Sequence, residues 1–296
     1  MTKIIEEGFK EINGIKIYYK SIGEGEPLFV LHGGPGLAHN YLFPHFSKLA
    51  EDYEVIFFDQ RSCGKSSGDE IPHDITMDNL VKDLEELRQS FNIEKINVLG
   101  QSFGGLLALN YAIKYPERLK TLLILESTGA RSDFIKKFQE NINSRVTEDI
   151  QKELSETNKK LNELTSSKVI KNGVGKVFSR YLSIINKLYF YNTSYMKNLD
   201  MEYFDDEMVR KSFTIQKQLH SYLIHYNLLN QLPRITCPTL IIHGDYDPIP
   251  YEEIELIHKT INGSEIFLIK ECGHFAHIEK PIEYFHIIRD FLYKNT

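Results

Sequence analysis

The sequence contains no tryptophan, few cysteines, no block of basic residues and no long hydrophobic run. Its cysteines are Cys63, Cys237 and Cys272, an odd number without the spacing of metal ligands. This pattern indicates reduced thiols rather than a disulfide framework or a zinc site. The chain carries 35 basic and 41 acidic residues, a net charge of −6, which argues against a nucleic-acid partner.

The absence of a long hydrophobic run argues against a membrane span and a signal peptide. No stretch approaches the roughly 18 apolar residues of a membrane span. The first twenty residues mix charges into their apolar positions instead of forming the hydrophobic segment of a signal peptide. We therefore expect a cytoplasmic protein without a membrane partner. No motif supports a metal or another cofactor, so we expect none, and the sequence leaves the oligomeric state open.

Short apolar runs rich in β-branched and aromatic residues recur along the chain and predict strands. From the second run onward they are continuous rather than alternating, which is typical of parallel strands covered on both faces. The runs cover residues 15–20, 27–33, 53–60, 95–101, 119–127, 238–245 and 264–271.

Helical patterns separate several of these runs. Apolar residues from Met77 to Phe91 follow one stripe of a helix, with Thr76 as its candidate N-cap. Residues 281–293 have the same spacing and open with a proline in a first-turn position. The alternation predicts an α/β fold with a mostly parallel central sheet flanked by helices.

One long stretch interrupts this alternation. From about Gly129 to Pro233 the chain is rich in Lys, Glu, Asn and Tyr and predicts several amphipathic helices without a convincing strand. We therefore predict a core in two parts, residues 1–128 and 233–296, with residues 129–232 inserted as a helical cap.

The stretch VLGQSFGGLLALNYA (98–112) places Ser102 between Gly100 and Gly104, where strand-like spacing gives way to helix-like spacing. A sharp strand-to-helix turn lifts a serine hydroxyl clear of the sheet, and small neighbours relieve crowding in its strained backbone. The pattern predicts that Ser102 is a nucleophile. The alternative is a polar residue in an ordinary loop.

Five ordered blocks carry a resemblance to a known family: LHGGPG (31–36), DQRSCGKS (59–66), GQSFGG (100–105), HGDYDPIP (243–250) and GHFAHIEKP (273–281). They resemble the α/β-hydrolase superfamily, and the first two most resemble its proline iminopeptidase branch of serine peptidases. The resemblance spans about two thirds of the chain and implies an α/β-hydrolase fold. The chain departs from the branch at Ser62, where glycine is usual, and in lacking tryptophan after the serine and in the lid. The missing tryptophans bear on substrate specificity.

A serine hydroxyl needs a base to accept its proton and an acid to orient that base. His274 is the predicted base, because it follows the strand over 264–271 in a loop that should reach the carboxyl edge of the sheet. Other polar residues of the blocks are interpreted as organising the loops or packing beside the site: His32, His243, His277, Asp59 and Arg61.

The acid should follow the preceding strand, where the sequence offers Asp245 and Asp247. The resemblance favours Asp247, because the family's acid follows the His-Gly pair by about three residues, and leaves Asp245 as a turn former. The reaction also needs two donors for the oxyanion. Phe103 N–H is one, and the resemblance implies Gly34 N–H as the other, since Pro35 has none. A merely flexible glycine-rich loop is the alternative.

The sequence leaves open which residues bind the substrate. An aminopeptidase must bind a free α-ammonium group, which carboxylates of the lid do in the branch that this chain resembles. Candidate ligands are Glu202, Asp205, Asp206 and Glu207 in the cap and Glu126 at a strand end. The cap carboxylates can instead form a solvated helix face, and Glu126 can bond its own loop. Cap aromatic residues either line a pocket or belong to a core: Tyr181, Tyr189, Phe190, Tyr191 and Tyr195.

These residues predict a serine hydrolase that acts through an acyl-enzyme on a small-molecule or short-peptide substrate. We prefer an aminopeptidase of the proline iminopeptidase type. A carboxylesterase or lactonase on small acyl substrates is the alternative, because the same groups cleave esters. A non-catalytic small-molecule receptor on the same fold is an alternative of another class, against which the complete set of triad residues argues.

Overall fold

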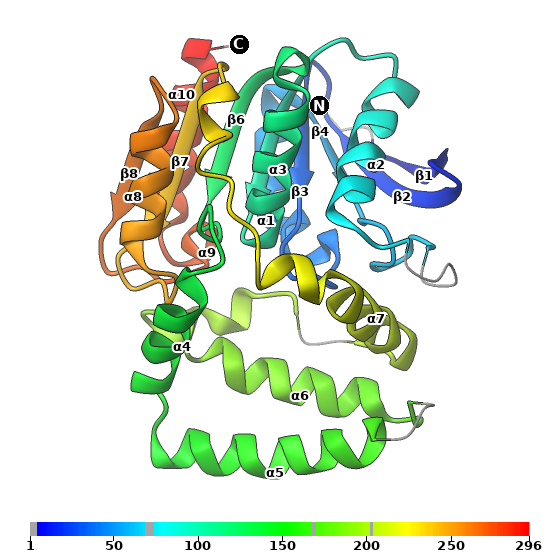
Figure 1. Ribbon diagram of the computed structural model, residues 1–296, viewed down its shortest axis with the longest axis vertical. Helices are drawn as coiled ribbons and strands as arrows, with labels where there is room; N and C mark the ends of the chain where they lie inside the picture. Colours follow the sequence, from blue (N-terminus) through cyan, green and yellow to red (C-terminus); the bar gives the residue numbers. More distant parts are fainter. Residues whose placement is uncertain (1–4, 69–73, 167–169, 202–203, 296) are drawn as a thin grey trace.

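The computed structural model describes residues 5–68, 74–166, 170–201 and 204–295. An eight-stranded sheet forms the centre of this part of the chain (Figure 1), in the order β1-β2-β4-β3-β5-β6-β7-β8. β2 pairs antiparallel with β1 and β4, and every pair from β4 to β8 is parallel. The strands are β1 Ile5–Ile12, β2 Ile15–Ile22, β3 Glu26–Leu31, β4 Tyr53–Phe58, β5 Ile96–Gln101, β6 Leu119–Leu125, β7 Thr239–Gly244 and β8 Glu265–Ile269.

Helices cover both faces of the sheet. Side chains of β3 alternate between two cores: Phe29 and Leu31 pack with α2, α3 and α8, whereas Leu28 and Val30 pack with α1, α9 and α10. This double cover is what the continuous apolar runs predict. The helices of the two layers are α1 Phe43–Phe46, α2 Met77–Ser90, α3 Phe103–Lys114, α8 Tyr251–Thr260, α9 Ala276–Glu279 and α10 Pro281–Asn295.

Several local predictions are confirmed. α2 begins after Thr76, whose hydroxyl accepts the N–H of Asn79 at 3.1 Å. α10 opens at Pro281, and all three cysteines are free thiols. The sequence analysis missed β1, because half of the residues of this edge strand are charged and it lacks a continuous apolar run.

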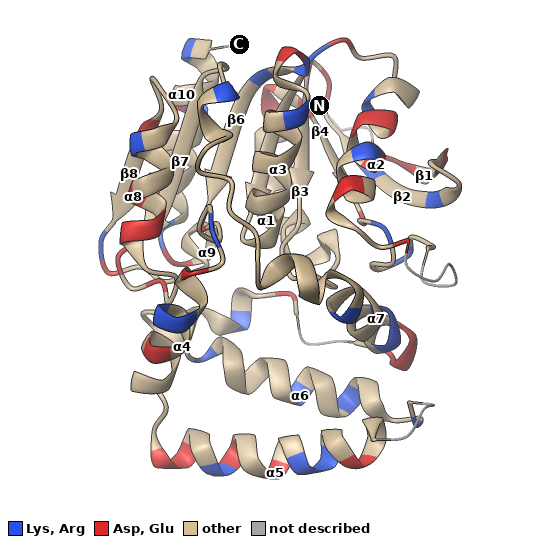
Figure 2. Ribbon diagram, viewed as in Figure 1, with Lys and Arg blue, Asp and Glu red and all other residues tan. Residues whose placement is uncertain are grey.

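The segment between β6 and β7 forms α4 Phe134–Ser144, α5 Glu148–Thr165, α6 Val174–Asn186 and α7 Asp206–Leu223. Figure 1 shows α5, α6 and α7 beyond the carboxyl ends of the strands. These helices have a small core of their own around Phe178 and Val209. Acidic and basic residues alternate along α5 (Figure 2). The carboxylate of Glu153 in α5 lies 3.0 Å from the ammonium of Lys187, the residue that follows α6. Among the described helices, none combines the length and hydropathy of a membrane span.

Candidate active site

Ser102 lies on a tight turn between β5 and α3. Its backbone has φ 58° and ψ −122°, an uncommon conformation for a residue other than glycine. Its N–H donates to the carbonyl of Leu125 at 3.0 Å, which holds the turn against the end of β6. A Cβ on Gly100 would collide with the carbonyl of Gly104, and one on Gly104 would collide with that of Leu31. The two glycines therefore allow the turn to close.

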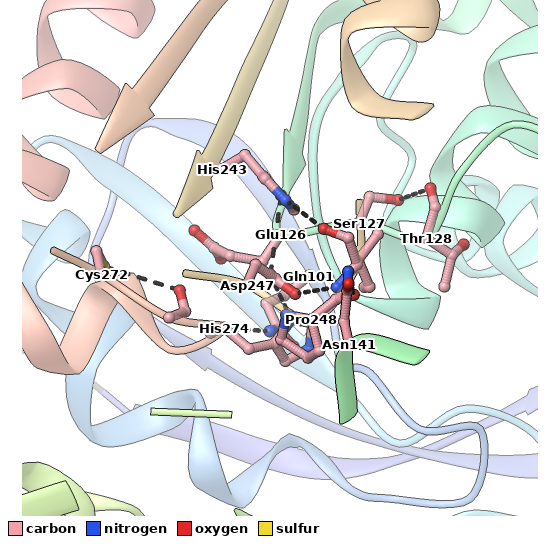
Figure 3. Close-up of polar contacts among 12 residues, drawn as sticks. Gln101, Glu126, Ser127, Thr128, Asn141, His243, Asp247, Pro248, Cys272 and His274 are labelled. Carbon is pink, nitrogen blue, oxygen red and sulfur yellow. Dashed lines mark hydrogen bonds and ion pairs between the residues drawn. The ribbon is translucent and has the colours of Figure 1, made fainter. Parts of the chain in front are cut away.

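Asp247 and His274 meet at the carboxyl edge of the sheet (Figure 3). Nδ1 of His274 lies 2.7 Å from Oδ2 of Asp247, and both residues are buried. Oδ1 of Asp247 accepts the N–H of Ile249 at 2.8 Å, so the carboxylate is fixed on both sides. An ionised carboxylate only accepts, so His274 carries its proton on Nδ1 and keeps a lone pair on Nε2.

The electrostatics of this pair favour the ionised acid. Burial raises the pKa of Asp247, but the imidazoles of His274 and His243 and the two hydrogen bonds outweigh burial and bring the pKa below its ordinary value. Asp247 is therefore negatively charged at neutral pH and is able to stabilise a positive charge on His274.

Ser102 and His274 line the same pocket, which has a volume of about 170 Å³. No hydrogen bond joins their side chains within the described residues, and such contacts are often loose without a substrate. Helices α6 and α7 supply much of the opposite wall, including Phe178, Ile185 and Gln216. The pocket thus lies between the loops at the edge of the sheet and helices α6 and α7.

Two backbone N–H groups beside this pocket have no protein partner among the described residues. They belong to Gly34 and to Phe103, the first residue of α3. The N–H of Gly33 is instead donated to the hydroxyl of Tyr41 at 2.7 Å. Free amides at a helix N-terminus attract negative charge. Gly34 and Phe103, but not Gly33, therefore have amides that can bind an oxyanion.

The predicted substrate carboxylates that lie within the described residues do not gather at the pocket. Glu126 is fully buried outside the residues that line it, and its Oε2 accepts the hydroxyl of Tyr284 at 3.2 Å. Burial, and next the charge of Asp247, raise the pKa of Glu126 well above its ordinary value. Asp205 is exposed and caps α7 by accepting the N–H of Met208 at 2.7 Å. Glu202 lies outside the described residues.

The other two candidate carboxylates of the cap, Asp206 and Glu207, have partners within the cap itself. Both oxygens of Asp206 accept backbone N–H groups, those of Gly173 and Gly175, at 2.8 Å. Glu207 is exposed and lies 3.2 Å from the ammonium of Lys211. Of the five cap aromatic residues, only Tyr189 is among the described residues that line the pocket. Phe190 is buried, and Tyr181 packs on Phe178. Tyr191 and Tyr195 are exposed.

A buried carboxylate that the sequence analysis did not single out holds the loop of His274. Glu279 accepts the N–H groups of Gly273 at 2.7 Å, Asn192 at 2.8 Å and Tyr191 at 3.3 Å. The N–H of His274 itself donates to the carbonyl of Tyr189 at 2.8 Å. The inserted segment is thereby tied to the imidazole. Glu279 lies within the last resembling block, which was the available signal.

The remaining polar residues of the blocks have structural partners. Asp59 accepts the ring and the backbone N–H of His39 at 2.7 and 3.0 Å. Arg61 is buried and pairs with both oxygens of Asp83 at 2.7 and 2.8 Å. Ser62, where the resembling family has glycine, has φ 60°. These residues shape the loop after β4 rather than the pocket.

Comparisons with known proteins agree with this architecture. A family model described as "alpha/beta hydrolase fold" matches residues 26–281. A protein named proline iminopeptidase from Saccharolobus solfataricus is 32% identical over 97% of this chain and 92% of its own length. One of the same name from Lactobacillus acidophilus is 30% identical over 98% and 99%.

Solved structures share the fold at lower identity. The structure of a proline iminopeptidase from Mycobacterium smegmatis has a TM-score of 0.72 at 21% identity and covers 98% of both chains. A thermophilic esterase from Thermogutta terrifontis has a TM-score of 0.70 at 21% identity, with 98% of this chain and 100% of that chain covered.

Proposed function

The chain belongs to the α/β-hydrolase family and is a serine hydrolase, and we propose that Ser102, His274 and Asp247 form its catalytic triad. Ser102 Oγ attacks the carbonyl carbon of the substrate while Nε2 of His274 accepts the hydroxyl proton. The same proton passes to the leaving group, which departs and leaves an acyl group on Ser102. Water then attacks the acyl-enzyme, with His274 again acting as the base.

The proposed oxyanion donors are the N–H groups of Gly34 and Phe103. Both lack another partner within the described residues, and both belong to segments that line the Ser102 pocket. Preorganised donors of this kind stabilise the negative oxygen of the tetrahedral intermediate, and the loss of one typically costs about 3 kcal/mol.

One observation carries the proposal: the buried 2.7 Å contact between Asp247 and His274 lies at the pocket that Ser102 lines from its strained turn. Strained backbone at such a turn is expected where a side chain must be displayed for chemistry. The chain order Ser, Asp, His is also the order expected in this fold.

We infer that residues 129–232 act as a cap over the pocket. Side chains of α6 and α7 supply one wall, so the substrate has to fit between the inserted helices and the loops of the sheet. For the substrate itself, we propose a short peptide from which the enzyme releases an N-terminal residue. Support comes from relatives named proline iminopeptidase that match nearly the whole chain.

A specific observation favours the second candidate, a carboxylesterase or lactonase. Among the described residues that line the pocket, none is Asp, Glu, Lys or Arg, and its walls include Leu37, Phe178, Leu182 and Ile185. A pocket without charged side chains suits a small neutral acyl group, whereas a free ammonium group gains most from a carboxylate.

The two candidates are separated by assaying the purified enzyme on proline p-nitroanilide and on short-chain p-nitrophenyl esters side by side. The Ser102→Ala variant is the control for each substrate. Release of nitroaniline that depends on Ser102 supports the aminopeptidase, and ester turnover alone removes it in favour of the esterase. Specific binding of small molecules without turnover of either class, together with an unreactive Ser102, would favour the receptor.

A further inference from the structure

We propose that Tyr41 and Gln101 are positioning residues that hold the oxyanion donors, the nucleophile and the base in register. The inference rests on the proposed function, because it concerns the loops that carry those groups. Three loops are involved: the oxyanion loop (residues 32–36), the nucleophile turn (100–104) and the base loop (272–275).

A chain of hydrogen bonds links the three loops. The hydroxyl of Tyr41 accepts the N–H of Gly33 at 2.7 Å and donates to Oε1 of Gln101 at 2.6 Å. Nε2 of Gln101 donates to the carbonyl oxygen of His274 at 3.3 Å. Tyr41 and Gln101 are each 1% exposed, so water does not easily replace these bonds.

Each bond ends next to a reacting group. Gly33 immediately precedes Gly34, and Gln101 immediately precedes Ser102. The third bond ends on the backbone of His274 itself. A displacement of Tyr41 or Gln101 therefore moves a donor, the nucleophile or the base relative to the other two. Misplacement by about 1 Å can lower a rate by roughly 100-fold.

The packing leaves little room for another arrangement. A Cβ on Gly33 would lie 2.9 Å from the Tyr41 hydroxyl and 3.0 Å from Oε1 of Gln101. The oxyanion loop thus rests directly on this hydrogen-bonded pair. Burial raises the pKa of Tyr41, so the phenol stays protonated and remains a donor at ordinary pH.

Tyr41 lines the pocket, but its hydroxyl is engaged with the protein on both its donor and its acceptor side. Its single proton goes to Gln101, and its oxygen accepts from Gly33. Replacement of the hydroxyl leaves a buried N–H and a buried amide oxygen without partners, which weakens the link between the two loops. The same replacement keeps the aromatic ring in place, which makes Tyr41→Phe a small change in packing.

The test compares Tyr41→Phe with Tyr111→Phe, using whichever chromogenic substrate the wild-type enzyme turns over. Tyr111 is also buried and donates its hydroxyl to Glu85 at 2.8 Å, but it does not line the pocket. We expect kcat of Tyr41→Phe to fall by about 10- to 100-fold with little change in KM. The kcat of Tyr111→Phe should stay within about threefold of wild type, even if its melting temperature falls as much as that of Tyr41→Phe.

Gln101→Met and the double variant complete the experiment. Because the two side chains share one bond, the loss of kcat in the double variant should be smaller than the product of the single losses. If Tyr41→Phe does not fold, Gln101→Met alone carries the comparison with Tyr111→Phe.

A folded Tyr41→Phe with kcat within about threefold of wild type overturns the inference, as does a loss confined to KM or one matched by Tyr111→Phe. Ser102→Ala and His274→Ala are measured in parallel. If either retains wild-type activity, the proposed function fails, which is a different result from an active Tyr41→Phe beside inactive triad variants.

Discussion

Nδ1 of His274 lies 2.7 Å from Oδ2 of Asp247, whereas the carboxylate of Asp245, two residues earlier, is directed to the backbone of Cys272. Asp247 is buried, and Asp245 is exposed. Two carboxylates on one loop thus have different partners. Only Asp247 is placed to hold the imidazole in the tautomer that leaves Nε2 free.

This difference predicts unequal effects of the same substitution. Asp247→Asn should lower kcat by about 10³- to 10⁴-fold, because an amide no longer favours the required tautomer. Asp245→Asn should remain within a few-fold of wild type, since its carboxylate contacts the Cys272 N–H at 3.3 Å and the Lys270 ammonium at 3.7 Å rather than His274. Steady-state kinetics of the two variants measure this difference, and equal losses of kcat would contradict the assignment of Asp247 as the acid.

The loop after β4 offers a stabilising substitution. Ser62 has φ 60°, and its buried hydroxyl has no hydrogen-bond partner among the described residues. Ser62→Gly removes a left-handed strain of about 1–2 kcal/mol at an entropic cost of about 0.5–1 kcal/mol. We expect a gain of about 1 kcal/mol in the free energy of unfolding, measured with urea.

Ser62→Ala is the matched control for that change. It removes the unpaired hydroxyl but keeps the Cβ, so its gain should be smaller than that of Ser62→Gly. Both variants should keep wild-type kcat. A Ser62→Gly protein less stable than Ser62→Ala would show that the left-handed backbone is not the source of strain.

His32 makes the oxyanion loop sensitive to acid. Its Nδ1–H donates to the carbonyl of Gly33 at 2.9 Å, and its Nε2 accepts the N–H of Gln60 at 3.1 Å, so the ring must be neutral. Burial lowers its pKa to about 4. The unfolded chain binds this proton below about pH 6.5 and the folded protein does not.

The stability due to His32 is therefore complete above about pH 6.5 and decreases as the pH falls toward 4. The decrease is about 1.4 kcal/mol per pH unit, or about 3 kcal/mol in all. His32→Gln lacks this titration, so its stability deficit should shrink between pH 7 and pH 5 in urea unfolding. The titration of His243 and His277 is the same in wild type and His32→Gln, so it cancels in the comparison. Parallel pH profiles of wild type and His32→Gln would show that folding does not lower the pKa of His32.

Glu126 should be neutral in the folded protein, because burial and the charge of Asp247 raise its pKa well above its ordinary value. A raised carboxyl pKa contributes stability below the unfolded pKa and loses it as the pH rises through the folded pKa. Glu126→Gln removes this dependence. Its stability relative to wild type should increase from pH 5 to pH 8, with kcat within about threefold.

Urea unfolding at the two pH values measures this change. A stability of Glu126→Gln relative to wild type that does not change between pH 5 and pH 8 would mean that the folded protein holds Glu126 ionised over this range. A large loss of kcat in Glu126→Gln would indicate that its charge serves the reaction.

Local patterns were enough to predict much of the fold. The apolar stripe from Met77 and the cap at Thr76 identify α2, and the continuous apolar runs identify the strands of the parallel part of the sheet. β1 was missed, because half of its residues are charged, although the Asn13-Gly14 turn joins it directly to β2 as a hairpin.

The sequence also predicted the candidate site in outline, since Ser102, Asp247 and His274 each belong to a short motif at a strand end. Tyr41 belongs to no such motif, and its proposed role depends on a contact with Gln101, 60 positions away in the chain. The position of Glu126 next to Asp247, rather than in the pocket, likewise follows from the packing of β6 against β7. The cytoplasmic location stays a prediction.

The most direct test of the account is labelling of the folded protein with a fluorophosphonate probe, followed by peptide mass spectrometry. The account predicts a single adduct on Ser102 in the wild-type enzyme, none in Ser102→Ala and far slower labelling in His274→Ala. A folded wild-type protein that stays unlabelled, or that carries the adduct on another residue, would contradict it.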